Sequence, residues 1–118
     1  MTRSSAIVVA ILALALAACG STPLEERVVG TWESSDHDTG FTERWTVRAD
    51  HGLRTEVGTG DDTSGFDSRW EVTSAEGDRL GIRTTREPVG LPEDVTLVFD
   101  GDDAFTVEPS GAVFHRAR

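Results

Sequence analysis

The sequence predicts an all-β domain, an antiparallel up-and-down meander of about eight short strands that follows an N-terminal signal helix. From Gly30 onward, apolar and polar side chains alternate in brief segments. Glycine and aspartate separate these segments, as expected of turns between strands. No stretch of this region keeps a helical period. So many strands in so short a chain favour a closed barrel, because closure removes exposed strand edges.

Residues 1–18 are interpreted as a signal peptide that is removed after export. Arg3 is the basic residue of the first five, and residues 6–18 form an unbroken apolar run. A helix needs roughly 20 apolar residues to cross a bilayer, so this run is too short to remain as a membrane span.

Residues 16–19, Leu-Ala-Ala-Cys, resemble the lipobox of bacterial lipoproteins, in which small residues precede a cysteine. The resemblance implies that Cys19 becomes the N-terminus and carries acyl chains such as palmitate, which anchor it to the membrane. The alternative is an ordinary secretory signal with an incidental cysteine. Cys19 is the only cysteine in the sequence, so it has no partner for an intramolecular disulfide. Lipidation would require such an unpaired thiol. Gly20 follows it, which in this family points to the outer membrane of a Gram-negative cell, and otherwise to the outer face of the cytoplasmic membrane.

Three regions are therefore expected: the signal (residues 1–18), a lipidated cysteine with a short tether (19–29) and one domain (30–118). Leu24–Val29 is expected to include a helical turn. The chain has 21 acidic against 11 basic residues and a formal net charge of −10. Such a surface repels nucleic acid and anionic lipid headgroups. We expect a monomer, with the lipid anchor as its contact with the membrane.

The first two strands are expected at Thr31–Ser35 and Phe41–Arg48. The second places Phe41, Trp45 and Val47 on one face. Residues 49–52 form a tight turn between this strand and the next, in which Gly52 is expected to adopt a positive φ.

The third strand is expected at Leu53–Val57, and residues 58–65, rich in glycine and aspartate, are expected to form a loop. The fourth strand has the clearest alternation, since Phe66, Ser68, Trp70 and Val72 share one face. Residues 75–78 are expected to form the turn after it.

The remaining strands follow the same logic. The fifth directs Leu80, Ile82 and Thr84 inward, and residues 87–93, with two prolines, form a longer connection. Two strands then pair across the turn at residues 100–103, and a last strand directs Phe114 inward. The inward residues of that pair are Val95, Leu97, Phe99, Phe105 and Val107.

The two ends of this domain, Val29-Gly30-Thr31-Trp32 and Phe114-His115-Arg116, look like the termini of lipocalin-like small barrels. The resemblance spans most of the domain and is nearest to the short lipocalin-like domains of bacterial lipoproteins. It implies a lipocalin-like fold and no defined activity. It also implies that Trp32 lies at the closed end of the barrel with Arg116 over its ring, a cation–π contact of about 0.5–2 kcal/mol.

No metal, cofactor or catalytic centre is expected. His37, His51 and His115 have no spacing typical of a ligand set, and loop histidines are the favoured interpretation. Residues 61–62 and 100–103 lack the final glutamate of a calcium loop, which favours ordinary turns. No serine lies in a nucleophile motif, so an enzyme is not expected.

Glu43 lies in register with Phe41, Trp45 and Val47 and would point inward in a regular strand. Either the strand begins at Arg44 or contains a bulge, which we favour, or Glu43 is a polar group in a pocket. An eight-stranded barrel is either filled by side chains or holds one small ligand. The filled core is favoured; a pocket would be lined by Glu43, Trp45, Trp70, Phe99 and Phe105.

Two functions remain open at this point. In the first, the domain is a non-enzymatic binding module that takes a small hydrophobic ligand at its open end. In the second, the barrel is solid and contacts another protein of the cell envelope.

Overall fold

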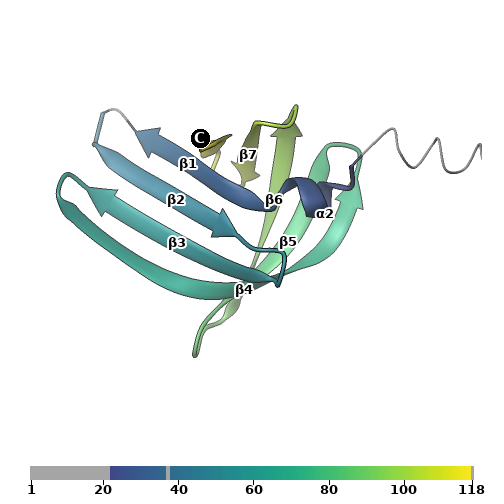
Figure 1. The fold of residues 1–118 in the computed structure, drawn as a ribbon, viewed down its shortest axis with the longest axis horizontal. Coiled ribbons are helices and arrows are strands. Elements are labelled where there is room, and N and C mark those ends of the chain that lie inside the picture. Colours follow the sequence, from purple (N-terminus) through teal and green to yellow (C-terminus); the bar gives the residue numbers. More distant parts are fainter. Residues whose placement is uncertain (1–21, 37, 118) are drawn as a thin grey trace, which may run out of the picture.

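The computed structural model describes residues 22–36 and 38–117, so the predicted signal, Cys19 and His37 lie outside the described residues. Eight antiparallel strands form one closed barrel in sequence order (Figure 1), which confirms the predicted fold class. No helix in the described ranges is long and apolar enough to span a bilayer. The elements are α2 (Leu24–Arg27), β1 (Gly30–Asp36), β2 (Phe41–Val47), β3 (Gly52–Thr59), β4 (Asp62–Glu76), β5 (Arg79–Arg86), β6 (Pro92–Asp100), β7 (Ala104–Glu108) and β8 (Val113–Arg116).

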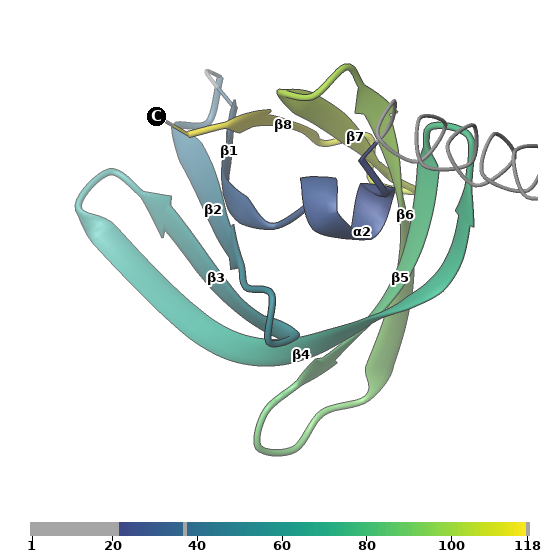
Figure 2. The ribbon, with the colours of Figure 1, turned by 45° about the vertical axis from the view of Figure 1, so that its right-hand side comes forward.

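The two ends of the barrel differ in what covers them. Because consecutive strands run antiparallel, the β2–β3, β4–β5 and β6–β7 turns lie at one end, together with α2. Arg27 donates to the Gly101 carbonyl at 2.6 Å, and Glu25 lies 3.5 Å from the His51 ring, so α2 contacts two of these turns. Figure 2 shows α2 inside the ring of strands. We call this the α2 end, and the end with the other four turns the far end.

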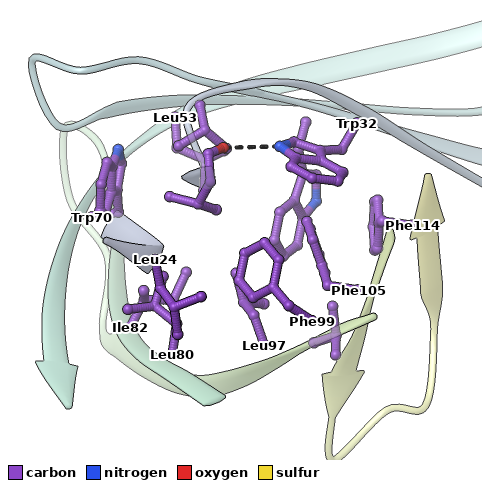
Figure 3. Packing of buried hydrophobic residues seen from close by; sticks show 14 residues of the cluster. Leu24, Trp32, Leu53, Trp70, Leu80, Ile82, Leu97, Phe99, Phe105 and Phe114 are labelled. Atoms are coloured by element: carbon purple, nitrogen blue, oxygen red, sulfur yellow. Dashed lines mark hydrogen bonds between the residues drawn. The ribbon is translucent and has the colours of Figure 1, made fainter. Parts of the chain in front are cut away.

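The hydrophobic core fills the barrel next to α2 (Figure 3). Leu24 and Val28 enter it from the tether and are buried. The aromatic rings pack directly, with the Phe105 centroid 4.6 Å from that of Trp32 and 5.4 Å from that of Phe99. Burying each such side chain is worth about 1.5–3 kcal/mol. The core comprises Leu24, Val28, Trp32, Trp45, Val47, Leu53, Trp70, Leu80, Ile82, Leu97, Phe99, Phe105, Val107 and Phe114.

The loop predicted at residues 58–65 is wrong, because strand pairing continues almost to its centre. Gly58 pairs with Thr63 and Thr59 with Asp62, which leaves a turn at residues 60 and 61. Gly60 has a φ of +61°, as such a turn requires. Backbone pairing needs no particular side chain, so glycine and aspartate did not prevent it. The turn predicted at residues 75–78 is likewise shorter, since β4 extends to Glu76.

The turn between β2 and β3 has the predicted position but not the predicted conformation. His51, not Gly52, has the positive φ, at +72°. The His51 ring stacks on Trp70 with centroids 4.6 Å apart, and its Nδ1 lies 2.8 Å from the Trp70 carbonyl oxygen. At Gly52 the Arg48 guanidinium occupies the space where a Cβ would stand, so a larger residue there would displace this exposed side chain.

Asp50 in this turn is expected to make the free energy of unfolding depend on pH under acidic conditions. Its carboxylate accepts from the Gly52 amide at 2.9 Å, and this bond, followed by the Arg48 charge, lowers the pKa of Asp50 below its ordinary 3.8. The stabilising contribution is therefore complete above pH 3.8 and is lost as pH falls through the folded-state pKa. Asp50→Asn keeps an acceptor but does not titrate. Below pH 3.8 its unfolding free energy should fall less steeply than that of wild type, as measured by urea denaturation; equal slopes would contradict this assignment.

Candidate functional site

The predicted contact between Trp32 and Arg116 is present and joins the two ends of the domain. The Arg116 Cζ lies 4.2 Å from the centroid of the Trp32 ring, which is fully buried. The indole Nε1 donates to the Val28 carbonyl at 2.8 Å. Arg116 Nη2 donates to the carbonyls of Arg27 at 2.9 Å and Asp102 at 3.0 Å. These bonds connect β8 to the tether and to the β6–β7 turn, so the pair is structural.

Replacing Arg116 by methionine should lower the unfolding free energy by about 1–3 kcal/mol. The change keeps an unbranched side chain over Trp32 but leaves partly buried carbonyls without their charged donor. Arg116→Lys, which keeps a charge but not the planar group that donates to several carbonyls, should show an intermediate loss. Urea denaturation measures both variants, and wild-type stability of Arg116→Met would contradict the structural role.

Four of the five residues considered as pocket lining lie in the hydrophobic core. Trp45, Trp70, Phe99 and Phe105 are 8%, 3%, 4% and 0% exposed. The Trp45 ring packs against Phe105, with centroids 5.9 Å apart. These side chains fill the barrel interior and do not line an open pocket within it. Trp70 also borders a shallow depression on the outer wall.

Glu43 differs from the other four. β2 is regular at this position, with Glu43 paired to Ser34 on β1 and Val57 on β3, so the favoured bulge or late strand start is wrong. The side chain is half-buried. Its Oε2 accepts a hydrogen bond of 2.6 Å from Trp45 Nε1. Because β2 is regular, the Glu43 side chain points to the inner face, as that of Trp45 does. The hydrogen bond from the indole N–H stabilises the carboxylate there.

Glu43 lines a hollow of about 810 Å³ at the seam between β1 and β8. β1 and β8 pair through two residue pairs, Trp32 with Arg116 and Glu33 with His115. Beyond these pairs the register stops, and the wall opens toward the far end. Most of the residues that line the hollow are polar or charged, but apolar atoms, including those of Val57, Val113 and Ala117, make up about half of its surface.

The large hydrophobic side chains exposed by the described residues all lie on far-end elements. Phe41 begins β2 and Val113 begins β8, and they are 39% and 45% exposed. Val89 and Leu91, in the β5–β6 connection, are 88% and 90% exposed. Figure 2 shows this connection projecting away from α2. The signal for it was in the sequence, since two apolar residues stand between prolines outside any alternating pattern. We call Phe41, Val89, Leu91 and Val113 the apolar rim.

The two described histidines lie on different elements, and the acidic turn at residues 100–103 faces arginines. His51 is at the α2 end, and His115 is exposed on β8. Asp102 and Asp103 face arginines, since Asp102 lies 3.1 Å from Arg27 and Asp103 lies 3.5 Å from Arg116. Within residues 22–36 and 38–117, no group of three or more histidine, cysteine, aspartate or glutamate side chains is arranged to hold a metal ion.

Comparisons of the chain with protein-family models, with curated proteins and with solved structures found no match.

Proposed function

We propose that this chain is a lipid-anchored, non-enzymatic binding module of the bacterial cell envelope that docks a partner protein at the far end of its barrel. The observation that carries the proposal is the distribution of apolar side chains. One set fills the interior next to α2, and the second, the apolar rim, is exposed at the opposite end. Val89 and Leu91 are the most exposed of the rim residues and stand two positions apart in one connection, and exposed apolar groups close to one another are typical of interaction sites.

The tether supports this orientation. Leu24 is 8% exposed and packs in the core, so the folded part of the chain includes Leu24, which lies within the segment expected to be a tether. With Cys19 acylated, residues 19–24 would span at most about 17 Å when fully extended. The α2 end would then lie close to the membrane, and the apolar rim would face the aqueous space of the envelope. A partner in that space, and not the anchoring bilayer, is the expected occupant.

Photo-cross-linking in growing cells tests the docking end. A photoreactive amino acid at position 91 should yield a discrete protein adduct. The same group at position 78, an exposed site in the β4–β5 turn at the α2 end, should not. The same adducts from both positions, or none from position 91, would contradict the proposal.

A small apolar ligand is the second candidate, favoured by the seam hollow of about 810 Å³. Ligand pockets usually measure about 300–1,000 Å³ and have mainly apolar linings. This hollow meets the size, but only about half of its lining is apolar, and charged side chains such as Glu43 contribute to the rest. Native mass spectrometry of the full chain from its host separates the two functions, because a retained lipid-sized adduct favours the ligand and an apo mass favours the docking module.

The anchor has its own test. Labelled palmitate fed to growing cells should be incorporated into the wild-type chain and not into Cys19→Ser. Unlabelled full-length chain recovered from the cytosol would contradict the proposed location.

A further inference from the structure

The backbone pairing between β1 and β8 ends before it reaches Val113, the first residue of β8. The Ala117 amide donates to the Thr31 carbonyl at 2.8 Å, so the backbone groups of Thr31, and by alternation of Glu33 and Ser35, point toward β8. The register pairs Glu33 with His115, and the next rung would join Ser35 to Val113. That pair is not formed among the described residues. Ser35 and Val113 therefore present strand-edge backbone groups on the two sides of the seam hollow.

The second observation is the charge on Glu43, which lines the same hollow. Trp45 Nε1 hydrogen-bonds one carboxylate oxygen, and within the described ranges no cation lies in ion-pair distance of Glu43. The two arginines of the hollow are already engaged. Arg44 donates to Glu33 at 2.8 Å, and Arg116 lies over Trp32. An incoming cation would meet a half-buried carboxylate on a chain of net charge −10.

These two features are arranged so that one extended segment could reach both. A strand added beside β1 would lie two strand spacings from β2, about 9.6 Å. On the inner face Ser34 lies between it and Glu43, because Ser34 pairs with Glu43 across β1 and β2. The small serine leaves room over β1 for a long side chain. Arginine and lysine have apolar stems of that kind, which can lie on Val57, the residue paired with Glu43 on β3.

We propose that the partner docks an extended segment in the seam hollow, pairs with the β1 edge at Ser35, and directs an arginine or lysine side chain onto the Glu43 carboxylate. This inference rests on the proposed docking function and names the chemistry of the partner. Main-chain bonds to an exposed strand edge are a recurrent mode of peptide recognition, in which side-chain contacts provide the specificity. Here the specificity would come from a charge-assisted hydrogen bond inside a partly enclosed site.

The three tryptophans make the test selective. Trp45 Nε1 donates to Glu43, Trp32 Nε1 to Val28 at 2.8 Å, and Trp70 Nε1 to Arg48 at 3.2 Å. Nuclear magnetic resonance of the ¹⁵N-labelled full chain in nonionic micelles therefore follows Glu43 through one indole signal, with two others as internal references. The probe is the peptide acetyl-Thr-Val-Arg-Val-Thr-amide, and its matched control has glutamine in place of arginine.

We expect the arginine peptide to shift the Trp45 indole and Ser35 amide signals, with Trp32 and Trp70 unchanged. The glutamine peptide should bind at least about tenfold more weakly. Glu43→Gln keeps an acceptor for Trp45 and should bind the arginine peptide with the same loss. Glu71→Gln, which removes an exposed acid from the outer face of β4, should bind as wild type.

The proposal is overturned if titration with the arginine peptide leaves the Trp45 signal unmoved or gives a Kd above about 10 mM. It is also overturned if the glutamine peptide, or the Glu43→Gln variant, gives the same shift. It is also overturned if n-hexylammonium alone binds as tightly as the peptide, since the site would then take a free organic cation. None of these results bears on cross-linking at position 91, so the docking function can survive the failure of this inference.

Discussion

Replacing Trp32 by alanine is expected to lower the free energy of unfolding by about 3–5 kcal/mol, the usual cost of removing a buried aromatic side chain. Trp32 is 0% exposed and contacts the rings of Phe105 and Phe99, with centroids 4.6 and 6.1 Å away. The substitution also removes the donor to the Val28 carbonyl and the aromatic face beneath Arg116. One residue thus joins the core, the tether and the last strand.

Urea denaturation followed by circular dichroism measures this loss. Trp32→Phe keeps a ring in the core but not the indole donor, so it should cost clearly less than alanine. Leu91→Ala removes a large apolar side chain that is 90% exposed, and it should change stability by less than about 0.5 kcal/mol. An equal loss for Trp32→Ala and Leu91→Ala would show that the interior is not packed as described.

The strands could be predicted because half-buried strands have a strict period of two residues. Ser68 and Trp70 on β4 are buried and Arg69 between them is exposed, so each position fulfils the alternation. The pairing of Phe99 with Phe105 across the β6–β7 turn follows from the same alternation and a short turn. These predictions needed only residues close in sequence.

The errors arose where composition was given more weight than pairing. Residues 58–65 have the composition of a loop, yet most of them lie in β3 and β4 because each strand supplies the other with backbone partners. The sequence favours a bulge or a late strand start at Glu43, because an inward carboxylate is costly. The structure compensates with the Trp45 indole N–H, which lies two residues away on the same face. The alternating pattern places both side chains on one face, but it does not indicate whether the indole donates to the carboxylate.

The candidate site could be predicted only in part. Pairing of Trp32 with Arg116 came from the resemblance of the chain termini, which are far apart in sequence. The seam was not predictable, because where β1 and β8 separate depends on barrel closure and not on local pattern. The apolar rim has a similar origin, since the strand order determines that the starts of β2 and β8 and the β5–β6 connection lie at the same end of the barrel.

Replacing Val89 and Leu91 together by aspartate is expected to weaken partner binding tenfold to a hundredfold. Both side chains are about nine-tenths exposed, so the free chain gains little from them. Buried in a complex, each would be worth about 1.5 kcal/mol or more, and 1.4 kcal/mol is a factor of ten in Kd. The measurement is the Kd, by calorimetry, for the protein captured by cross-linking at position 91. Unfolding free energy should stay within about 0.5 kcal/mol of wild type, because exposed positions contribute little to folding.

The charge of the introduced residues requires a separate control. Val89→Ser with Leu91→Ser removes the same apolar contacts without adding acid to a chain whose net charge is already −10. If the rim acts through apolar burial, this pair should lose most of the affinity that the aspartates lose. Wild-type affinity of the serine pair would mean that the aspartates act by repulsion alone, and that the partner does not bury this connection. Because the β5–β6 connection contributes nothing to the core, loss of binding without loss of stability is the result that assigns the far end to recognition.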